Sequence, residues 1–217
     1  MLRTKHGKLY RFFYIFVLFF IKWFFRLPFR VKKCNFEKIP LNGKLLICSN
    51  HISYIDPLVI GSNIGRYVYF MAKRELFSNR FLARLVTFFN SFPVNRTSGD
   101  TSSIRTSLKI LEDGQALGLF PEGTRSVDGQ VKEGKRGVGM LAVMSDAPII
   151  PLAIAGANKI IQKPHKRLFF PQIKMIAGDL IDVKGIKQEY GRKQASQVIV
   201  DQVMDSIKKL LKEINED

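Results

Sequence analysis

Apolar runs alternate with stretches of helical periodicity along most of this chain. The apolar runs are candidate strands, and they lie at 45–49, 67–72, 116–120, 149–155 and 173–178. Between them, the spacing of apolar residues predicts helices at 57–64, 78–90, 100–112 and 134–145. Strands that are apolar throughout are typical of a parallel sheet covered on both faces. The pattern therefore predicts an α/β domain with a layered, largely parallel sheet flanked by helices.

Two segments outside this alternation have patterns of their own. From Gln188 to Ile214, apolar residues recur on one face, which predicts a packed amphipathic helix. Residues 30–44 are mostly polar and contain Pro40 and Asn42-Gly43, so they are expected to form a connector.

The N-terminal segment is apolar and basic at once. Phe12 to Ile21 is an unbroken apolar run, and residues 1–33 carry nine Lys or Arg and no acidic residue. A helix of that run would be about 15 Å long, about half the thickness of a hydrocarbon core. Residues 1–33 are therefore predicted to be a helical anchor embedded in one anionic leaflet, on the cytoplasmic face of the cell membrane. Residues 34–217 would form the α/β domain.

Two other interpretations of the N-terminal segment compete with a membrane anchor. A secretory signal peptide has a similar basic start and apolar run, but RLPFRVKK follows here in place of a small-residue cleavage site. A helix buried in the protein core is the second alternative. The density of Phe, with Lys at both ends, favours lipid.

Composition narrows the class of protein. The net charge is +17, which calls for an anionic partner, and residues 34–217 hold 26 basic and 18 acidic residues. A nucleic-acid-binding protein is one alternative, but the basic excess is concentrated beside the Phe-rich run and no recognised DNA or RNA motif occurs.

Cys34 and Cys48 form no disulfide framework. Three His and no Cys pair at ligand spacing argue against a structural zinc site.

The most informative polar residues are His51 and Asp56, in the stretch SNHISYIDP directly after the run at 45–49. An imidazole in this position can take a proton from a hydroxyl, while the carboxylate fixes its tautomer and steadies the imidazolium. An alternative is that Asp56, which precedes Pro57, only caps a helix. Ser53 lacks the Gly pattern of a nucleophile elbow, so no covalent intermediate is expected on its hydroxyl.

A phosphate cradle is predicted in FPEGTRS, the segment that begins at the end of the run at 116–120. A sharp Pro-Glu-Gly turn exposes backbone amides, and Thr124 and Arg125 add a hydroxyl and a cation that suit a phosphate monoester. Glu122 is expected to orient Arg125 or another cation, or to fix the turn by accepting amide bonds.

Two more cations follow other apolar segments. Lys73 lies in MAKREL, and Arg96 ends SFPVNR. Together with His51 and Arg125, they come after the C-terminal ends of predicted parallel strands. Open α/β sheets bind their ligands at that edge.

The order of these segments resembles a known family. NHISYID, MAKREL, SFPVNR, FPEGTRS and IIPLAIAG follow one another at residues 50–56, 71–76, 91–96, 120–126 and 149–156. The set resembles the glycerophospholipid acyltransferase family, most closely the bacterial 1-acylglycerol-3-phosphate acyltransferases. The similarity spans about residues 40–160, and it rests on the ordered set, since any one segment alone is common.

The resemblance implies roles for individual residues. His51 would be the general base, and Asp56 its partner. Arg96 and the Glu-Gly-Thr-Arg motif would hold the acceptor phosphate, and Pro151 would shape the acyl-donor side. Members of this family are membrane-bound and need no metal or organic cofactor. The residues expected to bind substrate are Asn50, Lys73, Arg96, Glu122, Gly123, Thr124, Arg125 and Pro151.

The activity that the resemblance implies is direct acyl transfer. An acyl group would pass from acyl-CoA or acyl-carrier protein to the 2-hydroxyl of lysophosphatidic acid, a membrane lipid, giving phosphatidic acid. Another lysophospholipid, glycerol 3-phosphate or an ornithine lipid is an alternative acceptor. A non-catalytic membrane adaptor is a third hypothesis, but it leaves the His51–Asp56 pair and the arginines unexplained.

Overall fold

The structure is a computed structural model, and it describes residues 16, 17, 19, 23, 29–95, 101–126, 130–162 and 167–216. Arg96 and most of the anchor predicted for residues 1–33 therefore lie outside the described residues. Within the described part of the chain, no helix combines the length and apolarity needed to cross a bilayer.

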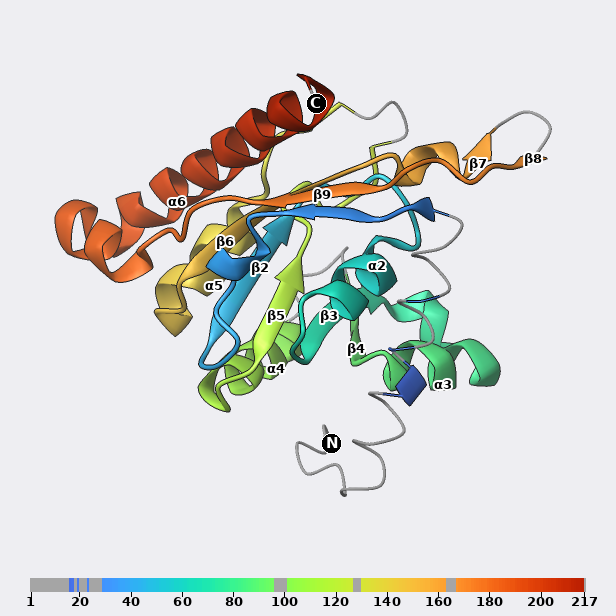
Figure 1. Cartoon of the computed structure of the whole chain (residues 1–217). Coiled ribbons are helices and arrows are strands. Elements are labelled where there is room, and N and C mark those ends of the chain that lie inside the picture. The colour runs from blue at the N-terminus through green and yellow to red at the C-terminus, as the bar shows by residue number, and fades with distance from the viewer. Residues whose placement is uncertain are drawn as a thin grey trace.

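Seven strands of the described chain form one sheet, in the order β1-β9-β6-β2-β5-β3-β4 (Figure 1). β6 and β9 pair antiparallel, and the other neighbouring strands pair parallel. The predicted α/β domain with a largely parallel sheet is thus confirmed. The strands are β1 (Lys32–Cys34), β2 (Leu45–Ser49), β3 (Val68–Lys73), β4 (Ser91–Val94), β5 (Ala116–Leu119), β6 (Ile149–Ala155) and β9 (Lys174–Ala177), with a separate antiparallel pair of β7 (Ile161–Gln162) and β8 (Arg167–Leu168).

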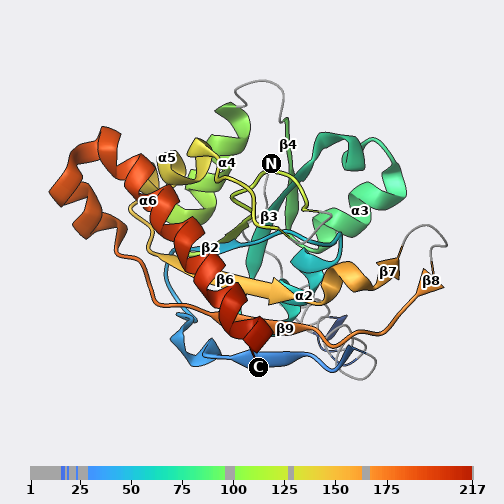
Figure 2. The ribbon, with the colours of Figure 1, turned by 90° about the horizontal axis from the view of Figure 1, so that it is seen from above.

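Helices cover both faces of the sheet (Figure 2). On one face, Leu45 and Ile150 of the sheet pack in a cluster with residues of α2. On the other face, Leu46 and Ile149 pack with residues of α4, α5 and α6. Burial from both sides explains why these strands are apolar at every position. The helices are α2 (Asp56–Asn63), α3 (Arg80–Phe88), α4 (Thr101–Glu112), α5 (Arg136–Ser145) and α6 (Val183–Glu216), with 3-10 turns η1 (Phe36–Lys38), η2 (Arg74–Phe77) and η3 (Ala157–Lys159).

β1 and α6 are among the elements that differ from the sequence-based expectation. Residues 32–34, expected in a connector, form the edge strand β1 through backbone pairing with β9, and all three side chains are exposed. A strand that buries no side chain leaves no apolar signal in the sequence. Helix α6 begins at Val183, before the predicted start at Gln188, and it contains a kink at Gly191, whose φ of 70° suits glycine.

The direction of the strands sets the position of the functional loops. β2, β3, β4, β5 and β6 all run parallel, so their C-terminal ends meet at one edge of the sheet. The segments that begin at residues 50, 74 and 120 therefore leave the sheet on the same side. We call this side the carboxyl edge.

Candidate active site

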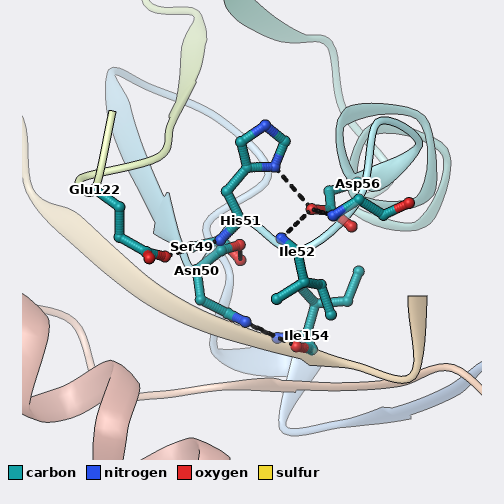
Figure 3. Close-up of polar contacts among 8 residues, drawn as sticks. Ser49, Asn50, His51, Ile52, Asp56, Glu122 and Ile154 are labelled. Carbon is teal, nitrogen blue, oxygen red and sulfur yellow. Dashed lines mark hydrogen bonds and ion pairs between the residues drawn. The ribbon is translucent and has the colours of Figure 1, made fainter. Parts of the chain in front are cut away.

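His51 leaves the carboxyl edge directly after β2 and reaches Asp56 at the start of α2 (Figure 3). The imidazole Nδ1 lies 2.8 Å from Oδ2 of Asp56. The side chain of His51 is 12% exposed and that of Asp56 is fully buried. The predicted pair is therefore formed, and its histidine can still be reached from solvent.

The Asp56 carboxylate also binds two backbone amides. Its Oδ2 accepts hydrogen bonds from the N–H of Ile52 at 2.8 Å and of Ser53 at 2.7 Å. Both amides precede α2, whose N-cap residue is Ile55, so the interpretation of Asp56 as a helix-capping side chain is wrong. Since a carboxylate only accepts hydrogen bonds, Nδ1 of His51 is the donor in this contact, and in the neutral imidazole the lone pair is therefore on Nε2.

Glu122 fixes the backbone of His51 from the other side. Its Oε1 accepts a hydrogen bond from the His51 N–H at 3.0 Å, and its Oε2 accepts one from the Lys132 N–H at 3.1 Å. The carbonyl of His51 in turn accepts from the Ser126 N–H at 2.8 Å. Glu122 is 2% exposed. Of its two predicted roles, the structure shows the one in which its carboxylate accepts amide bonds.

An aromatic stack supports the His51 ring. Phe120 lies parallel to the imidazole, with ring centroids 4.0 Å apart, and Phe70 stacks on Phe120 at 6.2 Å. Gly118 makes room for this stack, because a Cβ there would lie 2.2 Å from the Phe70 ring. Neither aromatic residue was predicted from the sequence to belong to the site. A signal was present in Gly118, the glycine inside an otherwise apolar strand.

Asn50 extends the sheet instead of facing the site. Its Nδ2 donates to the Ile154 carbonyl at 2.9 Å, and its Oδ1 accepts from the Ile154 N–H at 2.9 Å. The residue is 2% exposed. Its carboxamide thus joins the end of β2 to β6 as a backbone pair would. This placement argues for a positioning role and against the predicted contact with substrate.

Arg125 lies over the ring of Tyr54, with its Cζ 3.3 Å from the ring centroid. Tyr54 is 75% exposed, and it lies in the loop between His51 and Asp56. The arginine, on the turn after β5, is thereby brought to the loop that carries the histidine. Thr124 beside it and Lys73 at the end of β3 are both exposed at the carboxyl edge. Arg96 follows β4 but lies outside the described residues.

The turn at Gly123 is closed by its own backbone. Gly123 has a φ of 70°, a conformation that glycine adopts most readily. Its N–H donates to the Phe120 carbonyl at 2.9 Å, and the Ser126 N–H donates to His51. These two amides are therefore engaged within the protein. Neither of these two amides is available to a phosphate, and the exposed Thr124 and half-buried Arg125 remain to contact a ligand.

Pro151 lies on the other side of the sheet. Leu152 of β6 faces α2, so its neighbour Pro151 points to the opposite face, which α6 covers. A Cβ added at Gly178 would meet both Pro151 and Leu210 of α6. His51, in contrast, stacks on Phe120, which packs against the α2 face. Pro151 therefore shapes the sheet and does not line the site around His51.

Cys48 is the thiol nearest to His51 in the sequence. The residue is fully buried in β2, and this burial raises the pKa of its thiol to about 12. The thiol stays protonated at physiological pH, and only the thiolate is an effective nucleophile. Cys48 is thus a small apolar core residue.

The chain is similar to known acyltransferases. Residues 30–155 match a family model described as Acyltransferase. A 1-acyl-sn-glycerol-3-phosphate acyltransferase of Bacillus subtilis is 34% identical over 151 residues, which cover 69% of this chain and 72% of that protein. The enzyme of the same name from Borreliella burgdorferi is 26% identical, covering 79% and 69% respectively. The crystal structure of the 1-acyl-sn-glycerophosphate acyltransferase PlsC from Thermotoga maritima matches with a TM-score of 0.67 at 26% identity, covering 88% of this chain and 80% of that one.

Proposed function

The chain belongs to the acyltransferase family, and on that premise we propose that it acylates the 2-hydroxyl of lysophosphatidic acid to form phosphatidic acid. The acyl donor is a thioester, either acyl-CoA or acyl-carrier protein. The observation that carries this proposal is the contact of Nδ1 of His51 with Asp56, which assigns the lone pair of the neutral imidazole to Nε2 at the carboxyl edge of the sheet.

His51 acts as the general base. Its Nε2 takes the proton of the 2-hydroxyl while the hydroxyl oxygen attacks the thioester carbonyl carbon. The carbon–sulfur bond then breaks, and the imidazolium returns the proton to the leaving sulfur. The buried carboxylate of Asp56 steadies the positive charge that His51 carries in between. No covalent intermediate forms, in keeping with the high pKa of Cys48.

Glu122 and Phe120 keep the base in place. A general base has to stay within hydrogen-bond reach of the hydroxyl, so a small displacement of its backbone lowers the rate. The hydrogen bonds to Glu122 and from Ser126 hold the backbone of His51 at both its N–H and its carbonyl. Phe120 covers one face of the imidazole. Asn50 adds a third tie, through Ile154 in β6.

The acceptor phosphate binds to cations at the carboxyl edge. Arg125, stacked on Tyr54, presents a planar fork that matches phosphate oxygens. Lys73 and Thr124 are exposed at the same edge, and Arg96 follows β4 in the sequence. Residues 1–33, basic and rich in Phe, would hold the enzyme on the cytoplasmic face of the membrane, where the lipid acceptor resides.

The test is a substrate panel with the purified full-length protein in mixed micelles. Thiol release and lipid product would be measured with acyl-CoA and acyl-carrier protein as donors. The acceptors would be lysophosphatidic acid, another lysophospholipid, glycerol 3-phosphate and an ornithine lipid. We expect the highest kcat/KM with lysophosphatidic acid. Thiol release that does not depend on any acceptor would contradict acyl transfer. A higher kcat/KM with another acceptor would contradict the assignment of lysophosphatidic acid as the substrate.

A further inference from the structure

Helix α3 and the preceding turn η2 connect β3 to β4 and contribute no residue to the core. None of the residues in either element is buried. α3 packs mainly against η2 and β4, and in Figure 2 it lies at the rim of the molecule, away from α4, α5 and α6. The helix is nevertheless well formed, because the Asn79 side chain caps it by accepting from the N–H of Phe81 and Leu82.

The segment formed by η2 and α3 exposes apolar side chains. Phe81 is 75% exposed, Leu85 43%, Leu82 38% and Leu76 37%. Phe81 and Leu85 are four residues apart on α3, and Leu82 and Leu85 three, so these side chains are neighbours on one face. We call these four residues the α3 apolar surface. Apolar side chains gathered in this way on a protein surface are typical of a binding site.

Basic residues lie next to the α3 apolar surface. Lys73, Arg74, Arg80 and Arg84 are all exposed, and Glu75 is the acidic residue among positions 73–88. At about 100° per residue, Arg80 and Arg84 fall beside the stripe of Phe81, Leu82 and Leu85. Both arginines lie on the side of the stripe next to Phe81, and an apolar stripe bordered by arginines suits a helix that lies in the interface of an anionic bilayer.

A second copy of the chain would fit this surface poorly. A two-fold symmetric contact places the same patch on both partners. Each copy would then bring its own basic residues into the contact, and Glu75 is the acidic residue among positions 73–88 that could pair with them. Anionic headgroups, in contrast, neutralise these arginines while the acyl chains receive Phe81 and Leu85.

The position of the surface relates it to the active site. Lys73 is the last residue of β3, and η2 and the first turn of α3 follow directly at the carboxyl edge. β3 is the neighbour of β5, whose end carries Phe120 and Glu122. A bilayer in contact with this surface therefore lies beside the edge at which His51 is exposed.

We propose that the α3 apolar surface docks on an anionic lipid leaflet, as a contact separate from the N-terminal segment 1–33. This inference goes beyond the proposed reaction, because it concerns membrane binding whatever the acceptor is. Docking at two places would fix the orientation of the protein on the membrane. The carboxyl edge would then face the lipid phase from which a lipid acceptor enters.

Tryptophan fluorescence tests this contact in the full chain. Trp23 is the sole Trp of the sequence, so a Trp23→Phe, Phe81→Trp variant reports on α3 alone. The matched control is Trp23→Phe, Leu180→Trp. Leu180 is 47% exposed, and its neighbour Ile181 pairs with Ile149 at the N-terminal end of β6, which is the end away from the carboxyl edge. Vesicles of equal parts phosphatidylglycerol and phosphatidylcholine, with or without brominated acyl chains, would be added to both variants.

We expect brominated vesicles to quench the Trp at position 81 and shift its emission to the blue, with no change at position 180. Absence of quenching at position 81 in protein that co-sediments with vesicles would overturn the proposal, and Leu85→Trp repeats the test independently. Emission of the Trp at position 81 that is blue-shifted before lipid is added and does not change with lipid would also overturn the proposal, since the surface would then be covered by protein.

Arg80→Gln and Arg84→Gln should each weaken binding to these vesicles about fivefold. Unchanged binding would refute the assignment to anionic lipid.

Discussion

Replacing Asp56 by Asn separates the charge of the carboxylate from its role in orienting His51. The N–H groups of Ile52 and Ser53 both donate to Oδ2. An Asn side chain therefore has to place its carbonyl oxygen at the position of Oδ2, because its NH2 group at that position would face two other donors. That oxygen can still accept the proton on Nδ1 of His51. The amide nitrogen would take the position of Oδ1, which is buried and has no hydrogen-bond partner in the described structure. Asp56→Asn should thus preserve the tautomer and remove only the charge.

The size of the effect follows from the lost ion pair. Opposite unit charges about 4 Å apart attract each other by about 4 kcal/mol at an effective dielectric constant of about 20. Since about 1.4 kcal/mol corresponds to a tenfold change in rate, kcat should fall about a thousandfold. The folded state should lose little stability, because both amide bonds remain. Asp56→Ala removes those bonds as well, and each unpaired amide should cost about 1–3 kcal/mol.

Two measurements check this prediction. The kcat for thiol release at saturating lysophosphatidic acid gives the charge effect, and urea unfolding gives the stability of Asp56→Asn and Asp56→Ala. If Asp56→Asn keeps kcat within tenfold of the wild type, the carboxylate charge does not assist His51. If Asp56→Asn is as unstable as Asp56→Ala, the inferred orientation of the amide is wrong.

Three further predictions concern the surroundings of the base. Glu122→Gln turns one of the two acceptors of Glu122 into a donor facing an amide N–H, so urea unfolding should show a loss of about 1–3 kcal/mol, and unchanged stability would contradict this. Tyr54→Ala should raise the acceptor KM about two- to fivefold at constant kcat by freeing Arg125, whereas Tyr54→Phe should leave KM unchanged; equal effects in both variants would rule out the ring contact. In native protein, the exposed Cys34 should react rapidly with a thiol reagent. Cys48, whose pKa is raised to about 12 by burial, should react only in denaturant. Two rapidly reacting thiols in native protein would show that Cys48 is not buried in β2.

The order of strands and loops could largely be predicted from the sequence. Strands that are buried on both faces are apolar throughout, so the runs at β2, β3, β5, β6 and β9 are visible without any structure. The five-residue spacing of His51 and Asp56 also carried enough information to predict their contact. Edge strand β1 could not be found in this way, because its Lys32, Lys33 and Cys34 bury nothing and pair only through the backbone.

The contacts that support His51 could not be predicted, since they depend on which strands become neighbours. β2 lies next to β5 and β6 in the sheet, although β3 and β4 intervene in the sequence before β5. Glu122 consequently meets an amide 71 positions away, and Asn50 meets Ile154 across 104 positions. For the same reason Asn50 and Pro151, expected at the substrate, turned out to be a strand-joining residue and a residue of the opposite face.

The central claim is that His51 is the base for acyl transfer to lysophosphatidic acid. The most direct test is kcat/KM for thiol release by His51→Ala, with lysophosphatidic acid and an acyl thioester. The unfolding curve of the variant serves to confirm that the fold is intact. A positioned general base contributes about 10²–10⁴-fold, so we predict a fall of that size. A His51→Ala variant with the kcat/KM of the wild-type protein would contradict the assignment of His51 as the base.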